Sequence, residues 1–194
     1  MICPEQWSKE NIKITFVLKE ANALDETIDW RECLSDSEKS SNWGTTYNNV
    51  ARWAKAILEG GEHMDYVSPE ERTKWLCRVS VVNLKKVAGG AVTKHKELVE
   101  YARKDAQLIW KQLCLYKPDV IIACGSWAEW LLWEEILLKM QKTDKCAKGA
   151  LFGKIYKTQF PNKDTDTTVV CWCHPNARRN SRILFEQMSG IFRK

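Results

Sequence analysis

The sequence predicts a single α/β domain over residues 1–194, with a parallel sheet that carries helices on both faces. Two observations favour this class. Short apolar segments of strand type alternate with segments of helical period, and this order implies right-handed crossovers between parallel strands. Hydrophobic residues make up 44% and charged residues 28% of the 194-residue chain, which is typical of a globular domain with one core.

Four segments have the short, apolar and β-branched character of strands that are buried on both faces. In chain order they are Ile14–Leu18, Arg78–Val82, Val120–Cys124 and Thr168–Cys173. Because open parallel sheets bind their ligands at the carboxyl ends of the strands, the residues that follow these segments are the first candidates for a site.

Amphipathic segments separate or follow the strands and predict helices. They are Asn48–Leu58, Lys94–Tyr116, a segment from Ser126 to about Met140, and Ser181–Ile191. Pro118 ends the second helix, and the spacing of Ser126 and Glu129 predicts a capping box at the start of the third. Loops rich in Ser, Asp, Gly and Lys are expected over 35–46, 59–73 and 141–150.

Composition limits the partners and the compartment. The formal charge of +5 is a mild excess that is compatible with a polyanionic partner. The first ten residues lack an apolar core of the signal-peptide kind, and runs such as Val120–Cys124 are too short to span a membrane, so we expect a cytoplasmic protein without membrane contact. Eight cysteines in such a chain predict reduced thiols, and without a C-x-x-C pair no metal site is expected.

Polar side chains follow three of the four predicted strands. Glu20 and Asn22 come after the first strand, Asn83 after the second, and His174 after the fourth. Taken singly, each residue could be a solvated charge, a turn former or a satisfied core histidine. Together they predict a site with proton-handling and hydrogen-bonding groups at one edge of the sheet.

No nucleotide cofactor is expected. The glycine-containing segment "VAGGAVTKHK" lacks the spacing of a phosphate-binding P-loop, and the chain has no G-x-G-x-x-G fingerprint of dinucleotide binding.

Four segments resemble, in the same order, motifs of the uracil-DNA glycosylase superfamily. "FVLKEANA" resembles the first motif, and "RVSVVNLKKV" resembles the strand whose last asparagine reads the flipped base. "PDVIIACGSWAEWLL" is similar to a segment of the iron-sulfur-containing branch, and "CHPNARRN" resembles the second motif, which supplies a catalytic histidine and a loop that enters DNA. The resemblance covers about residues 12 to 190 and implies a three-layer α/β/α sandwich around a central four-stranded parallel sheet.

The chain departs from the superfamily pattern at several positions. Lys19 and Asn22 stand where the first motif has glycine and proline, and Asn176 stands where the second has serine. Cysteines at iron-sulfur spacing are missing, so we expect no cluster. "VLKEAN", "YNNVARW" and "VVNLKK" also resemble a small prokaryotic group that includes glycosylases acting on the glucosylated hydroxymethylcytosine of phage DNA.

The resemblance implies roles for the polar residues at the strand ends. Glu20 would orient or deprotonate the attacking water and stabilise the sugar cation, with Asn22 assisting it or replacing it. His174 would donate a hydrogen bond to the departing base, and Asn83 would select the base through its amide. Breaking the bond by simple hydrolysis is favoured over a Schiff-base lyase at Lys19.

Further residues are predicted to contact the base or the DNA. In the uracil-specific branch, a tyrosine of the first motif blocks bases with a C5 substituent, whereas here Ala23 and Leu24 follow Asn22, so the resemblance implies that a larger modified pyrimidine would fit. Trp43 and Tyr47 could stack on such a base. The residues predicted to contact DNA are Lys85, Lys86, Asn176, Arg178, Arg179 and Arg182.

Three other functions stay open at this point. The same residues would serve repair of uracil or another deaminated base, and the altered first motif is compatible with a catalytically silent fold that only binds DNA. A nucleoside hydrolase or deoxyribosyltransferase also uses a glutamate on an α/β sheet, but a free nucleoside has no phosphates for the arginines of residues 178–182 to contact.

Overall fold

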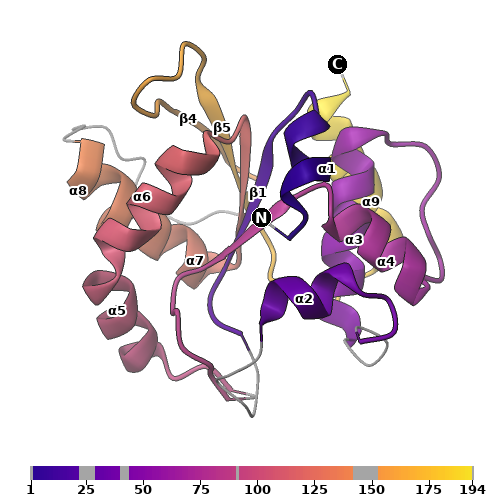
Figure 1. Ribbon diagram of the computed structural model, residues 1–194, viewed down its shortest axis with the longest axis horizontal. Coiled ribbons are helices and arrows are strands. Elements are labelled where there is room, and N and C mark those ends of the chain that lie inside the picture. Colours follow the sequence, from indigo (N-terminus) through magenta and orange to yellow (C-terminus); the bar gives the residue numbers. More distant parts are fainter. Residues whose placement is uncertain (1, 22–28, 40–43, 91, 142–152, 194) are drawn as a thin grey trace. The chain divides into compact units, whose positions relative to one another are not determined.

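The chain forms two compact units, each assembled from segments that are separated in the sequence (Figure 1). A sheet unit comprises Lys13–Ile28 and Val81–His174, and a helical unit comprises Met1–Ile12, Asp29–Ser80 and Pro175–Lys194. The computed structural model describes residues 2–21, 29–39, 44–90, 92–141 and 153–193.

In the part of the chain that the structure describes, the sheet contains five strands in the order β2-β1-β3-β5-β4. Their bounds are Ile14–Leu18 for β1, Ser80–Asn83 for β2, Val120–Cys124 for β3, Ile155–Thr158 for β4 and Thr167–Trp172 for β5. β3 pairs in parallel with β1 on one side and with β5 on the other, whereas β4 pairs antiparallel with β5. The protein is therefore of the α/β class, with a mixed five-stranded sheet.

The strand predictions differ in accuracy because the strands differ in burial. The bounds of β1 and β3 are confirmed, and every residue of both strands is buried, as their unbroken apolar runs indicate. The sequence does not predict β4. Because β4 adds a fifth strand that is antiparallel to β5, the prediction of a sheet made of four parallel strands is incomplete. β4 is an edge strand in which Ile155 and Lys157 are exposed, so it has no apolar run to reveal it.

Within the described ranges, five helical segments belong to the sheet unit, and Figure 1 shows four of them, α5 to α8, to the left of β1. They are α5 (His95–Lys104), α6 (Ala106–Tyr116), α7 (Ser126–Trp130), the π-helical segment η1 (Leu131–Leu137) and α8 (Leu138–Gln141). α7 packs against β3 and β5, while α5 and α6 pack against η1.

Two helix predictions need correction. The segment Lys94–Tyr116 is two helices, because Asp105 leaves helical geometry at φ −94° and ψ 6°. Ser126 does not form a capping box; the N-cap is Gly125, whose φ of +97° suits glycine, and the helix makes no side-chain cap bond there.

The helical unit has a core between α3, α4 and α9. Its helices are α1 (Pro4–Lys9), α2 (Trp30–Ser35), α3 (Gly44–Leu58), α4 (Pro69–Leu76) and α9 (Ser181–Phe192). α3 packs against both α4 and α9, and Trp53, Trp75 and Phe185 are buried. The predicted loops 35–46 and 59–73 are wrong in part, because they contain the first turn of α3 and the first half of α4.

Cys3 and Cys77 form a disulfide within the helical unit. The expectation that all thiols are reduced is therefore wrong for this pair, and their separation of 74 residues offers no spacing signal in the sequence. The free cysteines of the described ranges are Cys33, Cys114, Cys124, Cys171 and Cys173. Within the same ranges, we find no helix with the length and apolar character that crossing a membrane requires.

Candidate functional site

The strand register brings predicted site residues to one edge of the sheet. Val17, Ala123 and Cys171 are aligned across β1, β3 and β5. Glu20 lies three residues after Val17 of β1, and His174 lies three residues after Cys171 of β5. Both residues therefore follow the carboxyl ends of parallel strands, where α/β sheets bind their ligands.

Glu20 has a nearly enclosed carboxylate with only one of its two oxygens in an ion pair. Its side chain is 6% exposed, and Oε2 lies 3.2 Å from Nζ of Lys85. Oε1 is buried and has no hydrogen-bond partner among the described residues. A buried acceptor without a donor costs about 1–3 kcal/mol, so this oxygen requires an explanation other than stability.

The backbone of Gly89 packs directly against the same carboxyl group. A β-carbon at Gly89 would lie 2.3 Å from both the carboxyl carbon and Oε2 of Glu20. The N–H of Gly89 donates a 2.7 Å hydrogen bond to the carbonyl of Ala21, which holds the two segments together. Only glycine fits at position 89 while Glu20 keeps this position.

Lys85 is buried beside Glu20 and has a second carboxylate partner. Its Nζ lies 3.1 Å from Oε2 of Glu97 and 5.1 Å from the ring centre of Tyr101, and its side chain is 5% exposed. Burial alone would lower the pKa of Lys85, but the hydrogen bonds with Glu97 and Glu20 outweigh burial and raise it. Since the ammonium is enclosed and doubly paired, the structure argues against the predicted phosphate contact at Lys85.

His174 lies next to Gly125, the residue that follows β3. A β-carbon at Gly125 would lie 3.5 Å from Cβ of His174, so the two strand ends are in contact. Burial, together with the positive charge of Lys19, lowers the pKa of His174 to about 4. The imidazole is therefore neutral near pH 7 and has one N–H donor.

Asn83 is the last residue of β2, which is the strand next to β1 in the sheet. The N–H groups of Leu84 and Lys85 donate to the carbonyls of Leu18 and Lys19, at 3.0 and 2.9 Å, and so fix the end of β2 beside the end of β1. Oδ1 of Asn83 is buried and has no partner in the described part of the chain. Asn83 thus adds a second buried acceptor without a donor at this edge.

Lys19 precedes Glu20 and is half-buried. Burial lowers the pKa of Lys19, although the neighbouring charge of Glu20 acts in the opposite direction. Lys86, unlike Lys85, is exposed, and its Nζ donates to Oε1 of Gln112 at 2.8 Å.

The other predicted DNA contacts lie in the helical unit. Asn176, Arg178 and Arg179 are exposed in the stretch between β5 and α9. Arg182 is exposed on the first turn of α9 and forms an ion pair of 2.8 Å with Asp65.

Of the residues predicted to stack on the base, only Tyr47 is described. It lies in α3 with its ring centre 6.2 Å from that of Trp30, and burial raises its pKa. Asn22, Ala23 and Trp43 lie outside the described residues.

The roles of Gly89 and Glu97 were not predicted from sequence. Both depend on contacts with Glu20 and Lys85 across the fold, and the pair Gly89-Gly90 was considered only as a phosphate-binding loop, which it does not match. A polar cluster of the helical unit was also not predicted. In it, His63 bonds Oγ of Ser181 and Oδ1 of Asp65, each at 3.1 Å.

Ser181, His63 and Asp65 follow the order of a serine hydrolase triad, but their surroundings favour a structural role. The His63 side chain is only 4% exposed. The N–H groups of Arg182 and Ile183, which would face an oxyanion at Ser181, both bond the side chain of Asn180 instead. The cluster therefore ties the segment around His63 to the start of α9.

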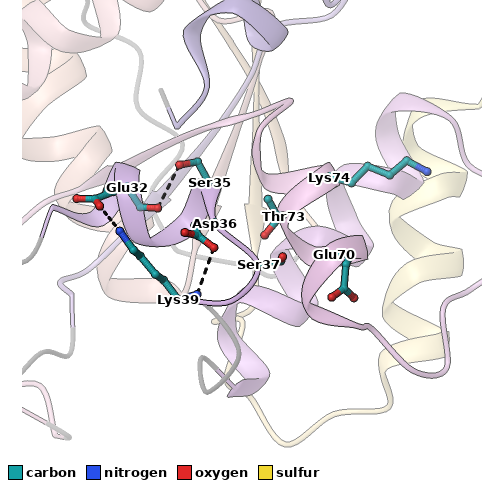
Figure 2. A pocket seen from close by; sticks show the side chains of 8 residues that line it. All are labelled: Glu32, Ser35, Asp36, Ser37, Lys39, Glu70, Thr73 and Lys74. Carbon is teal, nitrogen blue, oxygen red and sulfur yellow. Dashed lines mark hydrogen bonds and ion pairs between the residues drawn. The ribbon is translucent and has the colours of Figure 1, made fainter.

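A pocket between α2 and α4 of the helical unit contains none of the predicted site residues (Figure 2). Its lining mixes acidic and basic side chains, and Figure 2 shows Lys39 turned towards Glu32, with which it forms an ion pair. The lining residues are Glu32, Ser35, Asp36, Ser37, Lys39, Glu70, Thr73 and Lys74. The internal pairing of these charges gives no indication of a ligand.

Comparison of the sequence with protein-family models and with curated proteins finds no match. Over the described ranges, His, Cys, Asp and Glu side chains form no group of three or more that could hold a metal ion.

Proposed function

We propose that this protein is a monofunctional DNA glycosylase of the uracil-DNA glycosylase-like, three-layer α/β/α class. Its substrate would be a modified pyrimidine, for which glucosylated hydroxymethylcytosine of phage DNA is the specific candidate. The product would be an abasic site, and the cellular role would be defence against phage in the cytoplasm.

One observation carries this proposal. Glu20 and Asn83, at the ends of neighbouring strands, each hold a buried oxygen without a donor, Oε1 and Oδ1 respectively. Unpaired buried acceptors are disfavoured in a folded protein, and a site that awaits a ligand explains them. A water molecule would satisfy the first oxygen, and an N–H group on the edge of a pyrimidine would satisfy the second.

The carboxylate of Glu20 suits the chemistry of glycosidic bond cleavage. As the bond breaks, positive charge develops on the sugar and negative charge on the base. Oε2 is paired with the ammonium of Lys85, while Oε1 is available to orient a water and accept its proton. Asn22, outside the described residues, would assist in the same step.

His174 suits the departing base. A neutral imidazole with a pKa of about 4 can donate a hydrogen bond without first losing a solvation shell around a charge. Donation to the carbonyl oxygen of the base would stabilise the negative charge that develops there.

The amide of Asn83 would select the base. Its oxygen accepts from a base N–H, such as the exocyclic amino group that cytosine presents, and its nitrogen donates to a neighbouring acceptor. Ala23, Trp43 and Tyr47 would accommodate a substituent on the ring, as the sequence predicts.

Contacts with phosphates would offset the cost of extruding the base, which is a few kcal/mol. Exposed basic and amide side chains follow His174 in the chain at Asn176, Arg178 and Arg179. These residues, together with Lys86 and Arg182, would contact the DNA backbone. Lys85 is left out of this group because its charge is enclosed.

The test is a cleavage assay. Oligonucleotides that carry uracil, hydroxymethylcytosine or glucosylated hydroxymethylcytosine are incubated with the protein and with its Glu20→Gln variant, and abasic sites are detected by alkaline strand cleavage. We expect abasic sites in the glucosylated substrate with the native protein alone. Cleavage restricted to uracil would reassign the protein to repair, and DNA binding without any abasic product would favour a silent member of the fold.

A further inference from the structure

We propose that Lys85 is a positioning residue for the catalytic step: it holds Glu20 by one carboxylate oxygen and leaves the other for the attacking water. This inference rests on the proposed function and replaces the DNA contact that the sequence predicts for Lys85.

The geometry gives the two oxygens of Glu20 different environments. Oε2 lies between the ammonium of Lys85, at 3.2 Å, and the backbone of Gly89, whose added β-carbon would overlap it. Oε1 makes no hydrogen bond in the described part of the chain. The ion pair with Lys85 and the packing of the Gly89 backbone together restrict rotation of the carboxylate. The same oxygen, Oε1, is therefore presented to the water.

Lys85 is itself held in place from helix α5. Glu97 accepts a hydrogen bond of 3.1 Å from Nζ of Lys85, and the ring of Tyr101 lies 5.1 Å from the same atom. The main-chain N–H of Lys85 donates to the carbonyl of Lys19, one residue before Glu20. Lys85 thus connects α5 to the end of β1, and its side chain has little freedom.

The charge of Lys85 is shared between two carboxylates, those of Glu20 and Glu97. Within the described ranges, Lys94 lies 3.4 Å from Glu97, and the charge of Lys19 interacts with that of Glu20.

The decisive variant is Lys85→Met, which keeps most of the length of the side chain and removes its charge. We expect kcat on the glucosylated oligonucleotide to fall about a hundredfold, the size of effect that misplacing a reacting group produces, while KM stays unchanged. Lys104→Met is the matched control, because Lys104 lies over the same Tyr101 ring at 6.0 Å but is exposed. Native kcat in a folded Lys85→Met variant would overturn the proposal.

If circular dichroism shows that Lys85→Met does not fold, Glu97→Gln replaces it. The side chain of Glu97 is 42% exposed, so this change is tolerated more easily, and it removes one of the two anchors of Lys85. We expect kcat to fall about tenfold with KM unchanged, as a smaller misplacement would produce. An unchanged kcat would again overturn the proposal.

A second readout separates this inference from the proposed function. The carboxyl carbon of Glu20, labelled with carbon-13, is followed by NMR at a single pH near 7 in the protein without DNA. Removing the ammonium from beside Oε2 should shift this resonance in Lys85→Met, shift it less in Glu97→Gln, and leave it in place in Lys104→Met. A native protein without activity would refute glycosylase function, whereas an unshifted resonance would refute the hold of Lys85 on Glu20.

Discussion

Gly89 lies so close to the carboxyl group of Glu20 that a β-carbon at this position would fall 2.3 Å from the carboxyl carbon. Its backbone cannot move away easily, because its N–H is bonded to the carbonyl of Ala21 at 2.7 Å. The position of the candidate catalytic carboxylate is therefore set in part by the absence of a side chain at residue 89.

Gly89→Ala should displace Glu20 without removing any charge. We expect a reduction of kcat of about a hundredfold, because the carboxylate must move to admit the methyl group, and little change in DNA affinity. Steady-state kinetics on the modified oligonucleotide measure both. The neighbouring Gly90→Ala is the control, since a β-carbon there meets nothing within 4 Å, and it should behave as the native protein. Equal activity of the two variants would contradict the packing described above.

His174 should make the protein less stable in mild acid. Its pKa of about 4 in the folded state is below the ordinary value of 6.5, so between these values the unfolded chain binds a proton that the folded chain does not. The neutral His174 therefore contributes to the free energy of unfolding, fully above pH 6.5 and progressively less as the pH falls towards 4. The loss is at most about 3 kcal/mol, and solvent screening makes it smaller. The pKa of His63 is lowered in the same direction by burial.

Urea unfolding at pH 7 and at pH 5 measures this effect. His174→Gln should lose less stability between the two pH values than the native protein, because it has no imidazole to protonate. Thr45→Ala, a change at an exposed residue without a titratable group, is the control and should retain the native pH dependence. If His174→Gln and the native protein lose the same free energy of unfolding, the burial of His174 is not the cause.

The parts of the fold that the sequence predicts best are those where one element carries its own signal. The continuous apolar runs Ile14–Leu18 and Val120–Cys124 correspond to β1 and β3 because both strands are buried at every position. β4 carries a mixed pattern at the sheet edge, and the break at Asp105 falls inside an uninterrupted helical period. The local sequence of β4 therefore resembles a loop, and the local sequence around Asp105 resembles one continuous helix.

The candidate site divides in the same way. Glu20, Asn83 and His174 are found at strand ends because the approximate ends of these strands can be predicted from sequence. Lys85 and Lys86 are adjacent lysines, yet the first is enclosed by Glu20 and Glu97 and the second is exposed, a difference that depends on tertiary contacts. The fit of Gly89 to Glu20 likewise depends on tertiary packing.

The stretch after His174 should supply the salt-dependent part of DNA binding. Arg178→Ala and Arg179→Ala should each weaken binding for all sequences alike and lower the slope of log affinity against log salt by about one, since each removes one phosphate contact. Fluorescence anisotropy between 50 and about 200 mM salt measures the slope. Arg31→Ala is the control, because Arg31 is 71% exposed but pairs with Asp29 on its own helix turn. An unchanged slope in both variants would remove this stretch from the DNA contact.

Asn49 anchors the start of that stretch from within the helical unit. Its buried Nδ2 donates to the carbonyl of Pro175 at 2.7 Å, and its Oδ1 accepts from Arg52 at 2.9 Å. Asn49→Ala leaves a carbonyl and a guanidinium N–H without their partner, so we expect a loss of about 2 kcal/mol in the free energy of unfolding by urea. Thr45→Ala, an exposed change on the same helix, should cost less than about 0.5 kcal/mol.

The same variant distinguishes anchoring of the stretch from catalysis. With Pro175 released, residues 176–180 lose their fixed starting point, and more conformational entropy must be lost when DNA binds. Asn49→Ala should therefore raise the dissociation constant for DNA several-fold at a temperature where the variant is fully folded, while single-turnover cleavage at saturating protein keeps its native rate. A lower cleavage rate at saturation would show that Asn49 acts on the position of His174 as well, because only a change at the reacting groups persists once all DNA is bound.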